Sequence, residues 1–211
     1  MPRLLLIILF GFFGVKAFGL SDKYKWIFIK ESDNISIYYR ESDTLHYEEL
    51  KFTTIYKSTP NEVLSIVSDV ERLPQWSYIC VGTEIIKVVS NKEWYYYYIT
   101  ETPWPLDNRD VVLHVTILQD SISGVITINS ENFNGLLPEK EDYVRIVKLK
   151  SKYVLTPINE NYVQVEFYFS TDPGGNIPLW VINSAISYGP IKTLTALKNI
   201  VENTSNLPTY K

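Results

Sequence analysis

Hydrophobic and polar residues alternate along most of this chain, which is the pattern of β-strands with one buried face. Residues 163–169 show it most clearly, because Val, Val, Phe and Phe occupy the odd positions and Gln, Glu and Tyr the even ones. Alternating or clustered apolar residues predict further strands at residues 35–40, 50–56, 81–90, 93–101, 111–117, 122–129 and 145–155. Turn residues separate neighbouring strands, so we predict an antiparallel meander of eight strands.

Helical signals are few. Thr59 is a suitable N-cap for a helix over residues 61–69, because Pro60 then occupies the first helical position. Residues 20–29 are expected to form a short leading helix.

The longest predicted helix covers residues 177–202, and Gly189-Pro190 should bend it because proline removes a helical hydrogen bond. Its apolar residues are Ile177, Trp180, Val181, Ala185, Tyr188, Ile191, Leu194, Leu197 and Val201. One helix cannot cover eight strands as a flat layer, but it can close a strongly curved sheet and leave space between the two. The chain is therefore expected to be an α+β protein, with a curved antiparallel sheet wrapped around a long C-terminal helix.

Composition narrows the class of partner. The formal charge of −4 and a pI near 5.3 argue against a nucleic-acid surface, which is normally basic. Cys80 is the single cysteine, so no intrachain disulfide can form, and we expect it to be a small buried apolar residue. The 16 Tyr, 9 Phe and 5 Trp residues favour strands and can line an apolar cavity.

The sequence contains no clear catalytic, metal or cofactor motif. The two histidines, His46 and His114, are far apart and have no nearby cysteine to complete a metal site. Gly174-Gly175 has the neighbours of a turn and not those of a phosphate-binding loop. We therefore predict no cofactor, no metal and no enzymatic activity. An acid–base pair of carboxylates stays open, with Glu101 as one example.

The N-terminus has the order of a secretory signal. Arg3 precedes the apolar run 4–15, and Ala17 and Gly19 supply small residues for a signal peptidase. The run is short for a membrane span, although an uncleaved anchor is the alternative. We predict an exported protein, periplasmic or secreted. The boundaries that follow are a signal peptide at residues 1–19, one folded domain at 20–203 and a tail at 204–211.

Two segments differ from ordinary strand-and-turn sequence. Residues 103–111 read Pro-Trp-Pro-Leu-Asp-Asn-Arg-Asp-Val, and residues 172–183 read Asp-Pro-Gly-Gly-Asn-Ile-Pro-Leu-Trp-Val-Ile-Asn. They resemble the START domain, a family of lipid-binding and lipid-transfer domains related to the steroidogenic acute regulatory protein. The resemblance covers about residues 25–202. It implies a helix-grip fold with an apolar tunnel between the sheet and the C-terminal helix.

We predict a monomer that carries one lipid or other hydrophobic small molecule and contacts membranes transiently. The resemblance itself does not show that this member transfers its ligand between membranes. Ligand contacts are expected from inward strand residues and the helix stripe, namely Leu113, Val115, Arg145, Val147, Leu149, Val181, Ala185 and Tyr188. Two headgroup patterns of the family are not matched. Leu73 and Ser77 stand where the phosphatidylcholine-transfer member has charged residues, and Val115 stands where sterol carriers have an arginine. The ligand is therefore not specified.

Two arginines have the parity of inward-facing positions. Arg109 shares its parity with Val111, and Arg145 shares its parity with Val147 and Leu149. An arginine facing an apolar interior needs a partner, because an unpaired buried charge is costly. That partner is either a protein carboxylate or backbone carbonyls, or else a phosphate or carboxylate of the ligand. Arg145 is the better candidate for a ligand anchor, because Arg109 lies in the turn segment.

Two other functions stay open beside the carrier. A ligand sensor or interaction module would change its affinity for a partner when loaded, and that partner would co-purify only with the loaded form. A cyclase-like or hydrolase-like enzyme would need an inward carboxylate or histidine beside the cavity. No sequence feature separates a carrier from a sensor.

Overall fold

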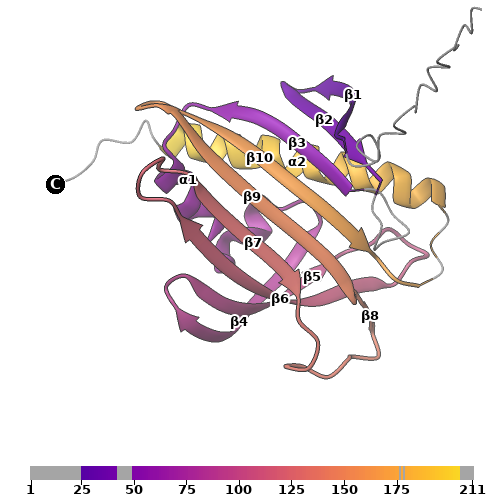
Figure 1. Cartoon of the computed structure of the whole chain (residues 1–211). Helices are drawn as coiled ribbons and strands as arrows, with labels where there is room; N and C mark the ends of the chain where they lie inside the picture. Colours follow the sequence, from indigo (N-terminus) through magenta and orange to yellow (C-terminus); the bar gives the residue numbers. More distant parts are fainter. Residues whose placement is uncertain (1–24, 42–48, 176, 178, 205–211) are drawn as a thin grey trace, which may run out of the picture.

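The computed structural model describes residues 25–41, 49–175, 177 and 179–204, although the side chains of residues 179–187 and 204 are outside the description. This part of the chain contains ten strands, two α-helices and one 3-10 helix (Figure 1). In chain order they are β1 (Ile27–Ser32), β2 (Ile35–Arg40), β3 (Glu49–Tyr56), α1 (Pro60–Val67), η1 (Val70–Gln75), β4 (Cys80–Ser90), β5 (Glu93–Thr100), β6 (Asn108–Gln119), β7 (Ile126–Asn132), β8 (Tyr143–Arg145), β9 (Lys148–Asn159), β10 (Tyr162–Asp172) and α2 (Leu179–Thr204).

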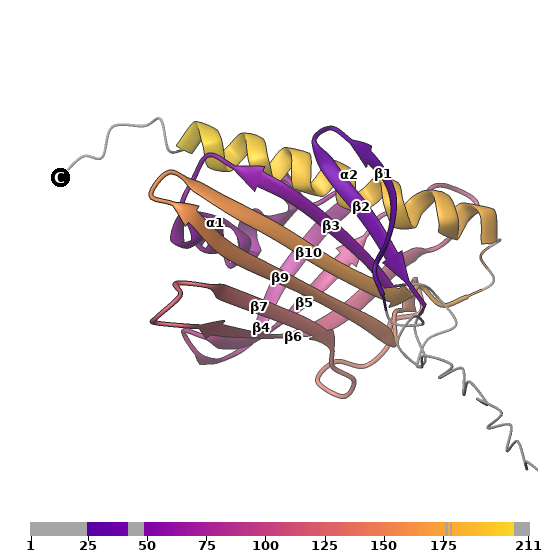
Figure 2. The same cartoon turned by 45° about the horizontal axis from the view of Figure 1, so that its top comes forward.

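The strands form one curved sheet in the order β1-β2-β3-β10-β9-β7-β6-β5-β4, and β8 is attached to β6. Neighbours pair in antiparallel fashion, apart from the short parallel pairing of β8 with β6. The connection through α1 and η1 leads from β3 to β4 at the far edge, while β10 returns to pair with β3. Helix α2 crosses the inner side of the sheet (Figures 1 and 2). The predicted α+β arrangement is therefore confirmed.

Helix α1 begins where the sequence predicts. The Thr59 hydroxyl accepts a hydrogen bond from the Glu62 backbone N–H at 3.3 Å. In return, the Thr59 backbone N–H donates to the Glu62 carboxylate at 2.8 Å. This capping box satisfies two N–H groups that the first helical turn would otherwise leave without partners, and Pro60 has no N–H to satisfy.

Helix α2 is continuous through Gly189-Pro190, the pair at which the sequence predicts a bend. A proline inside a helix costs about 3 kcal/mol relative to alanine. Beyond it, four buried side chains face the sheet: Ile191, Leu194, Leu197 and Val201. Each contributes roughly 1.5–3 kcal/mol on burial, so tertiary packing outweighs the proline.

The N-terminal expectation of a helix over residues 20–29 is wrong where it can be compared. Residues 27–29 belong to β1, which pairs with β2 along its length. Ile27, Phe28 and Ile29 are β-branched or aromatic, and such residues favour a pleated strand at a sheet edge. Residues 20–24 lie outside the described residues, as does the predicted signal segment.

The predicted strand 122–129 is too long at its start, because β7 begins at Ile126. The Asp120 carboxylate accepts hydrogen bonds from the backbone N–H groups of Ile122 at 2.8 Å and Ser123 at 3.3 Å. An aspartate that binds the backbone two residues later forms a tight turn and removes those N–H groups from sheet pairing. Ile122 is therefore exposed in a turn despite its apolar side chain.

Candidate ligand-binding site

The face of the sheet that points toward α2 is apolar and rich in aromatic rings. Its orientation is fixed by Tyr56 of β3, whose hydroxyl donates to the Leu194 carbonyl of α2 at 2.8 Å. Residues that pair across neighbouring strands share a face, so the register from Phe52 through Phe167 and Tyr153 to Ile128 places all four on this inner face.

One half of the inner face is completely packed. We call it the closed half, and its members all have 0% exposure: Tyr56, Val63, Ile126, Leu155, Val163, Val165, Leu194, Leu197 and Val201. They come from four strands (β3, β7, β9 and β10), from α1 and from the C-terminal part of α2. No surface remains in this half for a ligand to cover.

The other half, nearer the start of α2 along β9 and β10, is less completely covered. We call it the aromatic half, and its members keep 5–8% exposure: Trp94, Tyr96, Leu113, Ile117, Tyr153 and Phe167. The rings of Tyr153 and Phe167 pack in a tilted arrangement at 4.5 Å between centroids, and Phe169 stacks on Phe167 at 5.9 Å. Large flat rings with surface left uncovered are typical of sites that enclose apolar ligands.

Polar atoms in the aromatic half lack protein partners. The indole Nε1 of Trp94 is buried without a hydrogen bond, and no hydrogen bond to the hydroxyls of Tyr96 or Tyr153 occurs among the described residues. Burial raises the pKa of both tyrosines well above the usual value, so the hydroxyls stay neutral. These groups can donate hydrogen bonds to a ligand carbonyl, ester or hydroxyl oxygen.

Arg145 has protein partners on the outer side of the sheet. Its Nε and Nη2 donate to the two Asp110 oxygens at 2.7 and 3.0 Å, and other N–H groups donate to the carbonyls of Leu137 and Pro138. The Tyr97 hydroxyl donates to the same carboxylate at 2.6 Å. The partner of Arg145 is therefore a protein carboxylate with backbone carbonyls, the first of the two alternatives above.

The expected inward parity of Arg145 and Val147 is wrong because the strand is broken between β8 and β9. The Ile146 backbone N–H donates to the Asp110 carbonyl at 2.9 Å, and the Ile146 side chain is buried. This irregularity shifts the alternation by one residue, as a bulge does. Arg145 therefore pairs with Asp110 on the outer face, and Val147 is 45% exposed.

Arg109 lies on the inner face, as its parity predicts, and is only 5% exposed. Its Nη1 donates to the Asp107 carbonyl, while its Nε is buried without a hydrogen-bond partner. No carboxylate of the described residues lies within ion-pair distance of this guanidinium. The sequence favoured Arg145 as the ligand anchor. In the structure Arg109, and not Arg145, is the inner arginine without a carboxylate partner among the described residues.

The remaining predicted contacts divide into three groups. Leu113 and Val115 are buried on the inner face, and Leu149 is half-buried against the core. Val181 and Ala185 lie among the side chains outside the description. Tyr188, expected to face inward, is 49% exposed and packs edge-to-face on Tyr78.

The placement of Tyr188 follows from helix geometry. Nine residues separate it from Leu197, which at 3.6 residues per turn is half a turn out of phase. Because Leu197 is fully buried against the sheet, Tyr188 must point away from it. The apolar stripe read from the sequence was therefore wider than the stripe that is buried.

The aromatic residues of β5 were not among the predicted contacts. Residues 94–98 are aromatic on both faces, so alternation within the strand cannot show which side is buried. The neighbouring strand β6 carries the missing signal, because Val115 pairs with Trp94 and Leu113 with Tyr96. The clear alternation of β6 thus shows which side chains of the neighbouring strand β5 point to the inner face.

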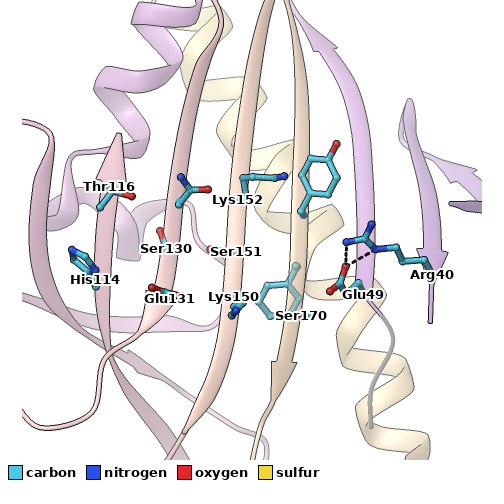
Figure 3. A pocket seen from close by; sticks show the side chains of 13 residues that line it. Arg40, Glu49, His114, Thr116, Ser130, Glu131, Lys150, Ser151, Lys152 and Ser170 are labelled. Atoms are coloured by element: carbon cyan, nitrogen blue, oxygen red, sulfur yellow. Dashed lines mark hydrogen bonds and ion pairs between the residues drawn. The ribbon is translucent and has the colours of Figure 1, made fainter. Parts of the chain in front are cut away.

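The outer face carries a shallow hollow of about 430 Å³ with a polar lining (Figure 3). Within it, Arg40 donates to Glu49 at 2.6 Å and the Lys152 ammonium lies 4.2 Å above the Tyr168 ring. The lining residues are Arg40, Glu49, His114, Thr116, Asn129, Ser130, Glu131, Lys150, Ser151, Lys152, Tyr168, Phe169 and Ser170. This hollow does not suit an apolar ligand.

Catalytic groups are not gathered on the inner face of the described part of the chain. Asp110 is its only buried carboxylate, and this residue faces outward to Arg145. His114 is on the outer face, where it contacts Glu93 at 2.9 Å and stacks on Tyr95, and Glu101 is exposed. Within the same residues there is no cluster of three potential metal ligands. None of the helices described is long and apolar enough to span a membrane.

The chain belongs to the START domain family, whose model matches residues 18–205. It is 27% identical to an uncharacterized Pseudomonas aeruginosa protein, over 90% of this chain and 92% of that protein. It is 26% identical to human phosphatidylcholine transfer protein, over 84% of each chain. The solved STAR-related lipid transfer protein of Xanthomonas axonopodis superposes with a TM-score of 0.76 at 29% identity, over 83% of this chain and 98% of that one. The resemblance read from the two motifs is thus confirmed.

Proposed function

We propose that this START domain binds one lipid or other apolar small molecule along the aromatic half of its inner face. The observation that carries the proposal is the set of rings from β5, β9 and β10 that share the inner face and keep 7–8% exposure, beside buried polar atoms without described partners. An apolar chain laid against them would gain roughly 25 cal/mol for each Å² removed from water. The named lipid-transfer relatives support the same class of ligand.

We further propose that the protein is a carrier and not an enzyme. The inner face of the described residues offers no carboxylate or histidine that could act as acid or base beside the ligand. A Streptomyces aromatase/cyclase shares the fold with a TM-score of 0.56, but at 10% identity this likeness concerns the fold alone. A carrier needs only to enclose its ligand and to release it at a membrane, through transient contact made by a monomer.

The carrier is proposed to act outside the cytoplasm, after removal of residues 1–19. The order of charge, apolar run and small residues in that segment supports export. N-terminal sequencing of the protein from its own host should find a mature chain that begins near residue 20. A chain that still begins at Met1 would contradict cleavage.

The ligand itself can be identified from the protein purified from its own host. Native mass spectrometry should show one bound apolar molecule per chain, which is then extracted and identified. Leu113→Trp should block uptake because it fills the inner face, whereas Thr116→Trp on the outer hollow should not. A protein that is empty when purified and takes up nothing from phospholipid vesicles would contradict the proposal.

A further inference from the structure

Two arginines of this chain differ in how their donors are used. A guanidinium has five N–H groups in a planar fork. Arg145 directs four hydrogen bonds to the Asp110 carboxylate and to two backbone carbonyls. Arg109, which is equally inaccessible, directs one described hydrogen bond to the Asp107 carbonyl, and its Nε has none.

Arg109 lacks a partner for its positive charge as well as for its N–H donors. Burial lowers the pKa of Arg109, and the neighbouring charge of Asp107 only partly opposes this effect. Asp107 is exposed and makes no ion pair with the guanidinium among the described contacts. The group stays protonated, because arginine keeps its proton in proteins. A buried cation of this kind is stabilised only when an anion lies beside it.

Arg109 occupies the end of the inner face, beyond the aromatic half. Cys80, Thr100, Arg109 and Val144 pair in sequence across β4, β5, β6 and β8 and so form one transverse row. Gly175, with a φ of 70°, lies against this row, and a Cβ built there would stand 3.6 Å from Arg109 Nη2. Gly175 therefore lies close to the guanidinium and has no side chain that could neutralise its charge.

We propose that Arg109 binds the anionic group, a phosphate or a carboxylate, of an amphipathic ligand whose apolar part lies along the aromatic half. The planar fork can hold two oxygens of either anion side by side. This inference rests on the proposed function, and it adds that the ligand carries a negative charge at one end. The polarity of the site then fixes the direction of the ligand, with its tail toward the closed half.

The test uses pairs of probes that share a tail and differ in charge. The full chain is titrated with hexadecanoic acid and hexadecanol, and separately with a lysophosphatidic acid and its monoacylglycerol. The wild type should bind the anionic member of each pair about tenfold or more tightly, as expected for a charged hydrogen bond in a buried site. Arg109→Met should lose this preference, and Arg109→Lys should keep part of it. Arg72→Met, on the exposed surface of η1, is the matched control and should retain it.

Each outcome bears on a different claim. Equal affinity of the wild type for both members of a pair would overturn the inference and leave lipid binding intact, whereas binding of neither would overturn both. An Arg109→Met protein that loses stability and both affinities in equal proportion would show a structural role instead. Should that variant fail to fold, the wild-type preference and its retention in Arg109→Lys decide. Inorganic phosphate alone, added at millimolar concentration, should compete only with the anionic probes; a site that prefers free phosphate would exclude the lipid source.

Discussion

The two halves of the molecule are stabilised in different ways. The closed half is held from within, by side chains of both helices and four strands that leave no exposed surface. The described members of the aromatic half keep 5–8% exposure. The strands behind it are held from the outer side by hydrogen bonds among Arg145, Asp110, Tyr97 and the carbonyls of Leu137 and Pro138. A fold that must leave room for a ligand can thus obtain its stability from the remaining core and from polar contacts on the opposite face.

Loss of the outer support should have the largest effect. Asp110→Ala leaves the Arg145 guanidinium buried with carbonyls alone, and breaking a buried pair in this way costs about 3–5 kcal/mol in the free energy of unfolding. Urea unfolding monitored by tryptophan fluorescence measures it. The double variant Asp110→Ala/Arg145→Met should recover much of the lost stability, because it also removes the buried charge that has no carboxylate partner. The control is Asp142→Ala, at an exposed site just before β8. It should change stability by no more than about 0.5 kcal/mol.

Large-to-small substitutions should distinguish the two halves directly. Leu197→Ala in the closed half should cost about 2–5 kcal/mol, with the upper part of that range expected because no neighbour has room to move. Leu113→Ala in the aromatic half should cost less, because its surroundings are already incompletely packed, and should weaken ligand binding instead. Unfolding of both ligand-free variants provides the comparison. Equal losses would mean that the two halves are packed alike.

Two tyrosines allow the same comparison with removal of a single oxygen. Tyr56→Phe deletes the hydrogen bond to the Leu194 carbonyl, which keeps its partner within the helix, at a cost of about 0.5–1.5 kcal/mol. Tyr153→Phe removes a hydroxyl for which the described structure shows no protein partner, so stability should stay within about 0.5 kcal/mol. Affinity for an ester or hydroxyl-bearing lipid should fall only in the second variant. A stability loss for Tyr153→Phe that matches Tyr56→Phe would contradict this distinction.

The sequence predicted the elements whose signals are local and continuous, and it failed where a strand is interrupted. Local signals were sufficient for α1, whose capping box lies within four residues, and for β2 and β10, whose alternation is uninterrupted. The two family motifs were sufficient for the fold. The face of Arg145 was not predictable, because a two-residue break after β8 reverses the alternation.

The partners of the two arginines were equally beyond a reading of alternation. Asp110 lies 35 positions from Arg145 in the chain, and only the parallel pairing of β8 with β6 brings them together. The isolation of Arg109 depends on what is absent around it, which no residue pattern encodes. Tyr188 was misplaced for a third reason, since an apolar side chain on a helix does not itself show which side of the helix is buried.

The smallest expected effect is on the dependence of stability on pH, where both ends of the molecule contribute. Burial alone would raise the pKa of Asp110, but hydrogen bonds from Arg145 and Tyr97 bring it below its usual value. A carboxylate with a lowered pKa in the folded state stabilises the fold above its unfolded pKa of about 3.9. That stabilisation is lost as the pH falls through the folded pKa.

Glu202, near the end of α2, has the same sign. Burial opposes ionisation there as well, and the Lys198 ammonium and the Lys57 backbone N–H lower its pKa. The stability difference between wild type and Asp110→Asn, measured by urea unfolding, should therefore be constant from pH 7 to 5 and shrink below about pH 4. Glu202→Gln should show the same trend with smaller amplitude, because its carboxylate is more exposed and more strongly screened. Parallel profiles for wild type and Asp110→Asn down to pH 3 would mean that the outer cluster does not depend on the charge of Asp110, and the aromatic half would then owe its support to shape alone.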